Sequence, residues 1–320
     1  MRKVILGRTN CEVSSISLGT WAFGGESMNG KMAVGWAGQN KKDSSDALTR
    51  AWELGINHWD TADVYGNGKS ESIIGEMWPK IPRKDIFIAT KLGWDKGPHK
   101  NWYNPNHMRK NLERSLVNLR TNCVDLLYLH HCNFGENDMY LNDAISTIKQ
   151  FQIEGKTKYL GLSDWSSERV LKYIKICDPD VVQIYHNVMD NNYITSELKN
   201  YVDKNNLGVC FFSPIKHGLL TGKYKNPVKF NDGDHRSRVK EFQDVKILKK
   251  LRKNKTLLEE RFKKKKNPVM QGLINSLFLD SDTGCVLLGQ RNKKQVEMAS
   301  LLGEKLAPDD AKWVKKLYKF

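Results

Sequence analysis

The sequence lacks long apolar runs. No segment approaches the roughly 18 consecutive apolar residues that a membrane-spanning helix requires, and the apolar stretch near Met1 is too short for a secretory signal. It also lacks extended low-complexity stretches, and 39% of its residues are apolar, which suffices for a sizeable core. We therefore predict a cytoplasmic protein without a membrane partner.

Cysteine is sparse and irregularly placed. The six cysteines show no Cys-x-x-Cys spacing, and several fall in expected strands, where a free thiol acts as a small apolar side chain. His130, His131 and Cys132 are metal-binding residue types, but consecutive residues of a strand alternate between its two faces, so the three cannot all face one ion. We predict free thiols and no metal site.

Acidic residues are in deficit: 36 of them stand against 52 lysines and arginines, a net charge of +16. The densest basic stretch, Lys249–Lys266, would attract nucleic acid, and such a field serves an anionic substrate or a phosphorylated cofactor equally well. Leu257, Leu258 and Phe262 within it are spaced for one helical face, which favours a helix with a solvated basic surface. We expect no nucleic-acid partner, and a nucleic-acid-binding barrel stays as an alternative.

Short apolar runs alternate with helix-like segments along almost the whole chain. An expected hairpin, Val4–Leu6 with Glu12–Ser14, comes first. The eight strands that follow are expected at Ile16–Leu18, Asn57–Asp60, Ile86–Thr90, Val124–His130, Tyr159–Ser163, Val181–Tyr185, Gly208–Phe212 and Cys285–Leu288. Between them, helices are expected at Asp43–Leu54, from the Asn104-Pro105 start signal onward, and at Asn142–Glu154, Ser166–Ile176 and Ser196–Asn205.

Eight strand-then-helix units with short connections predict an α/β fold, a (β/α)8 TIM barrel that occupies residues 1–320 as a single domain. A doubly wound sheet is the competing fold, but no Gly-x-Gly-x-x-Gly follows the first strand. Residues 213–284 are longer than one connection needs. We expect them to form a long loop and helical insertion over the barrel mouth after strand 7.

Four chemically active residues stand at or just beyond strand ends: Asp60, Tyr65, Lys91 and His130. Parallel strands of a barrel bring such positions together at one mouth. A tyrosine hydroxyl has a reference pKa of about 10; Lys91 would lower it, and Asp60 would hold the ammonium in place. His130 would orient a carbonyl oxygen. Each residue alone could have a purely structural role, such as a helix cap, a surface charge or a core side chain. Their joint placement predicts a proton-donating site.

The ordered motifs resemble the aldo-keto reductase superfamily over nearly the whole chain. The resemblance is to its bacterial-type branch with Gly-Thr-Trp-Ala, followed here by a Trp-rich loop at Trp36. It is carried by Leu18–Trp21, Asp60–Gly66, Ala89–Leu92, Val124-Asp125 leading to His130, Gly155–Ser163, Gln183, Ser213-Pro214 and Gly218–Lys223. It implies a catalytic tetrad of Asp60, Tyr65, Lys91 and His130 with Tyr65 as the proton donor.

The resemblance also implies a cradle for NADP(H), or NAD(H). Ser163 and Gln183 match residues that hold the nicotinamide carboxamide, and Phe212 matches a ring that stacks on the nicotinamide. Arg291 is the expected partner of the 2′-phosphate, although a plain surface arginine is the alternative. The complete set of expected cofactor residues is Gly19, Thr20, Trp21, Ser163, Asp164, Gln183, Phe212, Ser213, Pro214, Leu219, Gly222, Lys223, Gly289, Arg291 and Gln295.

The chain departs from the family pattern at three places. Asp164 stands where asparagine usually follows the serine, and Ala299 stands where asparagine commonly contacts adenine. Ile215-Lys216-His217 replaces a small apolar stretch of the phosphate loop, and its two basic residues would help to hold an anion. These departures make the cofactor cradle less typical of the family than the tetrad.

The predicted function is NAD(P)H-dependent reduction of an aldehyde or ketone to an alcohol, as in NADP-dependent aldo-keto reductases of the alcohol dehydrogenase or carbonyl reductase type. The alternative is a nucleotide-binding regulatory or sensing subunit with little turnover. Trp21, Trp94 and Trp102 are expected to line the pocket of a small-molecule carbonyl or alcohol substrate, or else to cover the barrel rim. Such a pocket would accept a sugar ring or an aromatic aldehyde, and neither the substrate nor the oligomeric state follows from the sequence.

Overall fold

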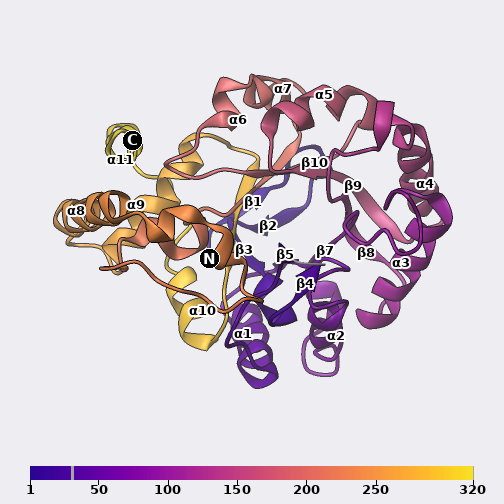
Figure 1. The fold of residues 1–320 in the computed structure, drawn as a ribbon, viewed down its shortest axis with the longest axis horizontal. Coiled ribbons are helices and arrows are strands. Elements are labelled where there is room, and N and C mark those ends of the chain that lie inside the picture. Colours follow the sequence, from indigo (N-terminus) through magenta and orange to yellow (C-terminus); the bar gives the residue numbers. More distant parts are fainter. Residues whose placement is uncertain (30–31, 320) are drawn as a thin grey trace.

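The computed structural model describes residues 1–29 and 32–319, and eight parallel strands form a closed barrel at its centre (Figure 1). Around the barrel the strand order is β10-β11-β12-β3-β6-β7-β8-β9. The strands are β3 (Ile16–Gly19), β6 (His58–Asp60), β7 (Phe87–Leu92), β8 (Val124–Leu129), β9 (Thr157–Asp164), β10 (Val181–Tyr185), β11 (Gly208–Phe212) and β12 (Gly284–Gly289). The predicted TIM barrel is confirmed.

Helices surround the barrel and cover its outer face (Figure 1). They are α1 (Lys41–Glu53), α2 (Lys69–Gly75), α3 (Pro105–Asn118), α4 (Leu141–Ile153), α5 (Ser167–Cys177), α6 (Asn192–Thr195), α7 (Leu198–Lys204), α8 (Val245–Arg261), α9 (Pro268–Asn275), α10 (Lys293–Ala299) and α11 (Pro308–Leu317). Among the described residues, no helix combines the length and the apolar character needed to cross a membrane.

Local capping chemistry starts several helices where the sequence predicts them. The Asn104 side chain accepts a hydrogen bond from the backbone N–H of His107, and Pro105 takes the first helical position of α3. Ser166 caps α5 in the same way through the N–H of Arg169. The helix expected at Ser196–Asn205 is wrong at its start, because Glu197 adopts a left-handed conformation (φ 68°) and α7 begins only after it.

The strand ends also differ from prediction in ways that matter for the site. β7 continues through Leu92, so Lys91 lies inside the strand with its side chain 1% exposed rather than closing it. β8 stops at Leu129, and His130 is the first residue of the following loop. Asp60 ends β6 as predicted.

An N-terminal hairpin closes the end of the barrel at which the strands begin. β1 (Lys3–Ile5) pairs antiparallel with β2 (Glu12–Ser14), which confirms the predicted hairpin apart from a one-residue shift of its first strand. Val4, Leu6 and Val13 are buried against residues near the beginnings of barrel strands, including Phe87 and Val181. The hairpin therefore covers the base of the barrel, where the strands begin.

The long connection between β11 and β12 reaches the mouth, as predicted. It holds α8 and α9, which lie beside each other on the outside of the barrel (Figure 1), and a short 3-10 helix, His235–Arg238. Just before that helix, Asp234 forms an isolated bridge with Gly35 and accepts a hydrogen bond from the N–H of Ala37 (3.0 Å). The insertion thus packs against the loop that follows β3.

We expect the hairpin to act as a packed plug. Leu6 is fully buried in it, whereas Ile5 next to it is 50% exposed. Leu6→Ala should lower the free energy of unfolding by about 2–5 kcal/mol, because it removes buried methyl groups and leaves a cavity, while Ile5→Ala should change it by less than about 0.5 kcal/mol. Urea unfolding of both variants checks this, and equal effects would contradict the plug.

Candidate active site

A cavity of about 1290 Å³ opens at the carboxyl ends of the barrel strands. Its wall includes Asp60, Tyr65 and His130, and Lys91 lies buried beside them. The four residues predicted from strand ends are therefore together at the mouth of the barrel.

The floor of the site is a buried ion pair. The ammonium of Lys91 donates to Asp60 Oδ1 at 2.5 Å and to the carbonyl oxygen of Thr61 at 2.7 Å, and both charged side chains are 1% exposed. Gln183 Nε2 donates to the other carboxylate oxygen of Asp60 at 2.7 Å. Burial alone would lower the pKa of Lys91, but Asp60 and Tyr65 raise it, so the ammonium keeps its charge.

Tyr65 lies above this pair, with its hydroxyl 3.4 Å from Lys91 Nζ. Trp21 stacks on its ring at a centroid distance of 6.0 Å, which fixes the ring in the cavity wall. Burial raises the pKa of Tyr65, and Lys91 opposes that effect only in part. The expectation that Lys91 brings the pKa below its usual value is therefore wrong for the site without ligands, because desolvation outweighs the neighbouring charge.

His130 completes the group. Its ring centroid lies 6.1 Å from that of Tyr65 in an edge-to-face arrangement. Burial and the nearby Lys91 lower the pKa of His130 well below its usual value, so the imidazole is neutral. A neutral ring N–H can donate a hydrogen bond to a substrate oxygen without adding a second positive charge.

Most of the predicted cofactor residues also line the cavity. Those in its wall are Gly19, Thr20, Trp21, Ser163, Gln183, Phe212, Ser213, Pro214, Lys223, Gly289, Arg291 and Gln295. Asp164, Leu219 and Gly222 are not in the wall. Leu219 is fully buried and Gly222 packs closely on the backbone of Leu251, so these two shape the loop from behind.

Arg291 reaches the cavity but already has partners within the protein. Its Nη2 donates to the carbonyl oxygen of Ala37 at 2.7 Å, and its Nε donates to Gln39 Oε1 at 3.0 Å. Gln295 accepts a hydrogen bond from the backbone N–H of Arg291 at 2.8 Å. The guanidinium is thus held at one end of the cavity by the loop after β3.

The two basic residues of the loop after β11 do not present free positive charge. Lys216 pairs with Glu241 at 2.5 Å. Burial, the neighbouring His235 and Lys216 lower the pKa of His217 to about 3, so its ring is neutral. The expectation that Lys216 and His217 together help to hold an anion is not supported by this geometry.

All three tryptophans predicted for the substrate pocket, Trp21, Trp94 and Trp102, line the cavity. Several other wall residues were not expected from the sequence: Trp165, Tyr185, His235, Arg236 and Arg238. Trp165 directly follows the end of β9, and a residue just after a strand end is expected at the barrel mouth. The last three belong to the insertion, where no local pattern marks which side chains turn inward.

A family model described as the aldo/keto reductase family matches residues 15–318. The chain belongs to the aldo/keto reductase family. The solved glycerol dehydrogenase of Gluconobacter oxydans superposes with a TM-score of 0.80 at 24% identity, covering 98% of this chain and 94% of that one. This likeness confirms the barrel as the family fold.

Three curated relatives are similar over about two thirds of the chain. The aldo-keto reductase yakc of Schizosaccharomyces pombe, whose name carries NADP(+), is 30% identical over 67% of this chain and 64% of its own length. The NADH-specific methylglyoxal reductase of Escherichia coli is 28% identical, with 69% and 70% covered. A Schizosaccharomyces pombe protein named as a voltage-gated potassium channel subunit beta is 28% identical, with 70% and 64% covered.

Asp164, where this chain departs from the family pattern, is held by backbone hydrogen bonds. Its carboxylate accepts hydrogen bonds from the backbone N–H groups of Cys132 and Ser166, both at 2.9 Å, and lies 3.7 Å from His131 Nδ1. Burial would raise the pKa of Asp164, but the nearby His131 and these backbone donors lower it. Asp164 therefore anchors the loop after β8 and does not face the cavity. Ala299 is buried in α10.

Neutral histidines of the cavity predict acid sensitivity. Burial lowers the pKa of His217 to about 3 and, together with Arg238, that of His235 to about 4. In the unfolded chain a histidine takes up its proton near pH 6.5. The stability that a neutral folded histidine contributes is therefore present above pH 6.5 and is lost as pH falls from 6.5 toward these folded values.

His217→Gln should remove one such histidine. Between pH 6 and pH 4, wild type should lose stability more steeply than the variant, by up to about 1.4 kcal/mol per pH unit. Urea unfolding of both proteins at several pH values measures the difference. Parallel pH profiles would show that His217 takes up its proton at about the same pH in the folded protein as in the unfolded chain.

Proposed function

We propose that this protein is an oxidoreductase that reduces an aldehyde or ketone to an alcohol with NADPH, or with NADH, and that Tyr65 is the proton donor. The observation that carries the proposal is the contact of the Tyr65 hydroxyl with the buried Lys91–Asp60 pair in the wall of a large cavity. Family membership and a relative whose name carries NADP(+) support it.

The cavity fits the chemical parts of such a dinucleotide. Aromatic surface from Phe212 and Trp165, whose rings meet edge to face at 4.9 Å, suits a flat nicotinamide ring. Lys223 and Arg291 also line the cavity and suit phosphate groups. Gln183 uses its amide N–H on Asp60, which leaves its carbonyl oxygen to accept from a carboxamide. When bound, the nicotinamide would supply hydride to the substrate carbon.

The protein's own residues would handle the proton. Tyr65 gives its hydroxyl proton to the carbonyl oxygen as negative charge develops there. Lys91 stabilises the phenolate that forms, and Asp60 keeps the ammonium charged and in position. Neutral His130 donates a hydrogen bond to the same oxygen and aims the carbonyl.

Tyr65→Phe tests the assignment. The variant should lower kcat/KM for NADPH oxidation with a panel of small aldehydes by about 10²–10⁴-fold, because it removes the general acid. Quenching of tryptophan fluorescence should still report NADPH binding. Tyr201→Phe, a change on α7 outside the cavity wall, is the matched control and should keep wild-type activity.

Two outcomes would contradict the assignment. Unchanged turnover by Tyr65→Phe would mean that another group donates the proton. A wild type that binds NADPH tightly but turns over no aldehyde of the panel would overturn the proposed activity.

Arg291 is proposed to select NADPH over NADH by contacting the 2′-phosphate. Arg291→Ala should raise the Kd for NADPH about tenfold or more and change that for NADH much less, because a charge-assisted hydrogen bond contributes about 1.5–3 kcal/mol. Fluorescence titration measures both constants, and Arg252→Ala on the exposed face of α8 is the control. Equal weakening of both nucleotides would show that Arg291 serves only the loop at Ala37 and Gln39.

A regulatory subunit is the second candidate, because one relative is named as a voltage-gated potassium channel subunit beta. This function predicts tight nucleotide binding with very slow hydride transfer. The complete, paired arrangement of Asp60, Lys91, Tyr65 and His130 favours turnover instead.

The substrate is proposed to be small and ring-shaped, such as a sugar or an aromatic aldehyde, because indole rings of Trp21, Trp94 and Trp102 line the cavity.

A further inference from the structure

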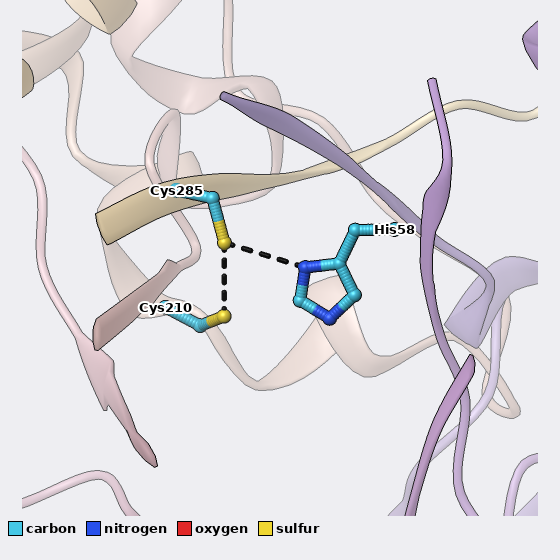
Figure 2. Close-up of side chains that lie close together, drawn as sticks. All are labelled: His58, Cys210 and Cys285. Carbon is cyan, nitrogen blue, oxygen red and sulfur yellow. Dashed lines mark hydrogen bonds between the residues drawn. The ribbon is translucent and has the colours of Figure 1, made fainter. Parts of the chain in front are cut away.

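A second cluster of reactive side chains lies inside the barrel, away from the cavity wall. His58, Cys210 and Cys285 point toward one another from β6, β11 and β12 (Figure 2). All three are fully buried, and none lines the cavity at the mouth. None of them has a role in the proposed reduction.

The barrel register creates this cluster from distant parts of the chain. Cys210 and Cys285 are direct partners in the parallel pairing of β11 with β12. β3 lies between β12 and β6, and its pairing of Leu18 with Trp59 sets Ser17 beside His58. The four side chains therefore come from four consecutive strands and meet inside the barrel.

The distances within the cluster suit a shared ion. Cys210 Sγ lies 3.0 Å from Cys285 Sγ, and Cys285 Sγ lies 3.4 Å from His58 Nδ1. One ligand atom from each of these three residues falls within 4.8 Å of the other two. Around a tetrahedral zinc ion, with Zn–S near 2.3 Å and Zn–N near 2.0–2.1 Å, neighbouring ligand atoms are about 3.5–3.8 Å apart. Shifts of less than about 1 Å would bring the two sulfur atoms to that spacing.

Two hydroxyl groups lie beside the cluster. One belongs to Tyr128, a fully buried side chain that interacts with Cys210. Ser17 Oγ, 2.8 Å from His58 Nδ1, offers a neutral oxygen as a fourth ligand.

Cys285 lies at the centre of the cluster. Its Sγ contacts both Cys210 Sγ and His58 Nδ1, and all three side chains are sealed from water. A lone thiolate in an apolar core is costly unless a positive charge compensates it. Thiolates are also the form in which cysteine binds metals.

We propose that His58, Cys210 and Cys285 bind one zinc ion inside the barrel. Two thiolates and a neutral imidazole balance Zn²⁺ to zero net charge, whereas Cu⁺ with the same ligands would leave a buried negative charge. Ion binding releases the thiol protons to solvent and changes no oxidation state. The ion joins β11 and β12 to β6 across the seam where the last barrel strand meets the first, so its role is structural.

A disulfide between the cysteines is the competing chemistry. Paired strands are about 4.8 Å apart, which lies within the Cα separations that disulfides span. The metal is favoured because a third ligand, His58, lies against the same sulfur, and because all three side chains are sealed from solvent oxidants.

The test uses the full-length protein, purified under reducing conditions after expression with added zinc. Mass spectrometry of the metal content should find about one zinc per chain. Refolding with Co²⁺ in place of zinc should give the absorption of cobalt–thiolate charge transfer, a readout on wild type that does not depend on any variant folding. Cys210→Ser and Cys285→Ser should each lose at least about tenfold of the bound zinc.

Cys177→Ser is the matched control, because Cys177 is also buried but lies in α5 away from the cluster, and it should keep the zinc. Zinc content well below one per chain and equal in wild type and Cys285→Ser would mean adventitious metal and would overturn the site. A Cys210–Cys285 disulfide in the peptide map of a second preparation, purified without reductant, together with absence of bound metal, would overturn it in favour of a redox pair.

Discussion

The buried pair of Lys91 and Asp60 is the interaction on which the geometry of the mouth depends. Two opposite charges, each 1% exposed, lie 2.5 Å apart with additional hydrogen bonds from Gln183 and to the carbonyl of Thr61. Removing one partner of such a pair leaves an uncompensated buried charge and costs about 3–5 kcal/mol. Here the ammonium of the pair also contacts the Tyr65 hydroxyl. The pair ties three barrel strands, β6, β7 and β10, to one reactive group.

Around that group, strand ends and several loops supply the charged and aromatic side chains of the cavity wall. The barrel supplies rigid strand ends, and the loops after β3, β7 and β11 supply much of the wall. The loops after β3 and β11 join where Asp234 bonds to Gly35 and Ala37. Much of the local positive charge is already neutralised by partners such as Glu241, and the cavity histidines are neutral. Beside these neutralised groups, the wall keeps positive side chains such as Lys223, Arg238 and Arg291.

The sequence was informative where function follows from strand periodicity. Asp60 and His130 could be placed because apolar runs mark strand ends, and the Asn104-Pro105 signal predicted the start of α3. The orientation of side chains within irregular loops could not be predicted, since no periodicity governs it; Asp164 turns to backbone donors and Lys216 to Glu241 for this reason. No local pattern in the sequence indicates the His58–Cys210–Cys285 cluster, because its members are far apart along the chain and closure of the barrel brings them together.

The central claim is that Lys91 acts on the reaction through Tyr65. A double-mutant cycle tests it directly, with kcat/KM for aldehyde reduction measured for wild type, Lys91→Met, Tyr65→Phe and the double variant, each checked for folding by circular dichroism. If the two residues form one unit, the double variant should be about as slow as the slower single variant, as is usual for groups that act together. Fully additive losses in activation free energy would show that Lys91 works independently of Tyr65 and would contradict the account.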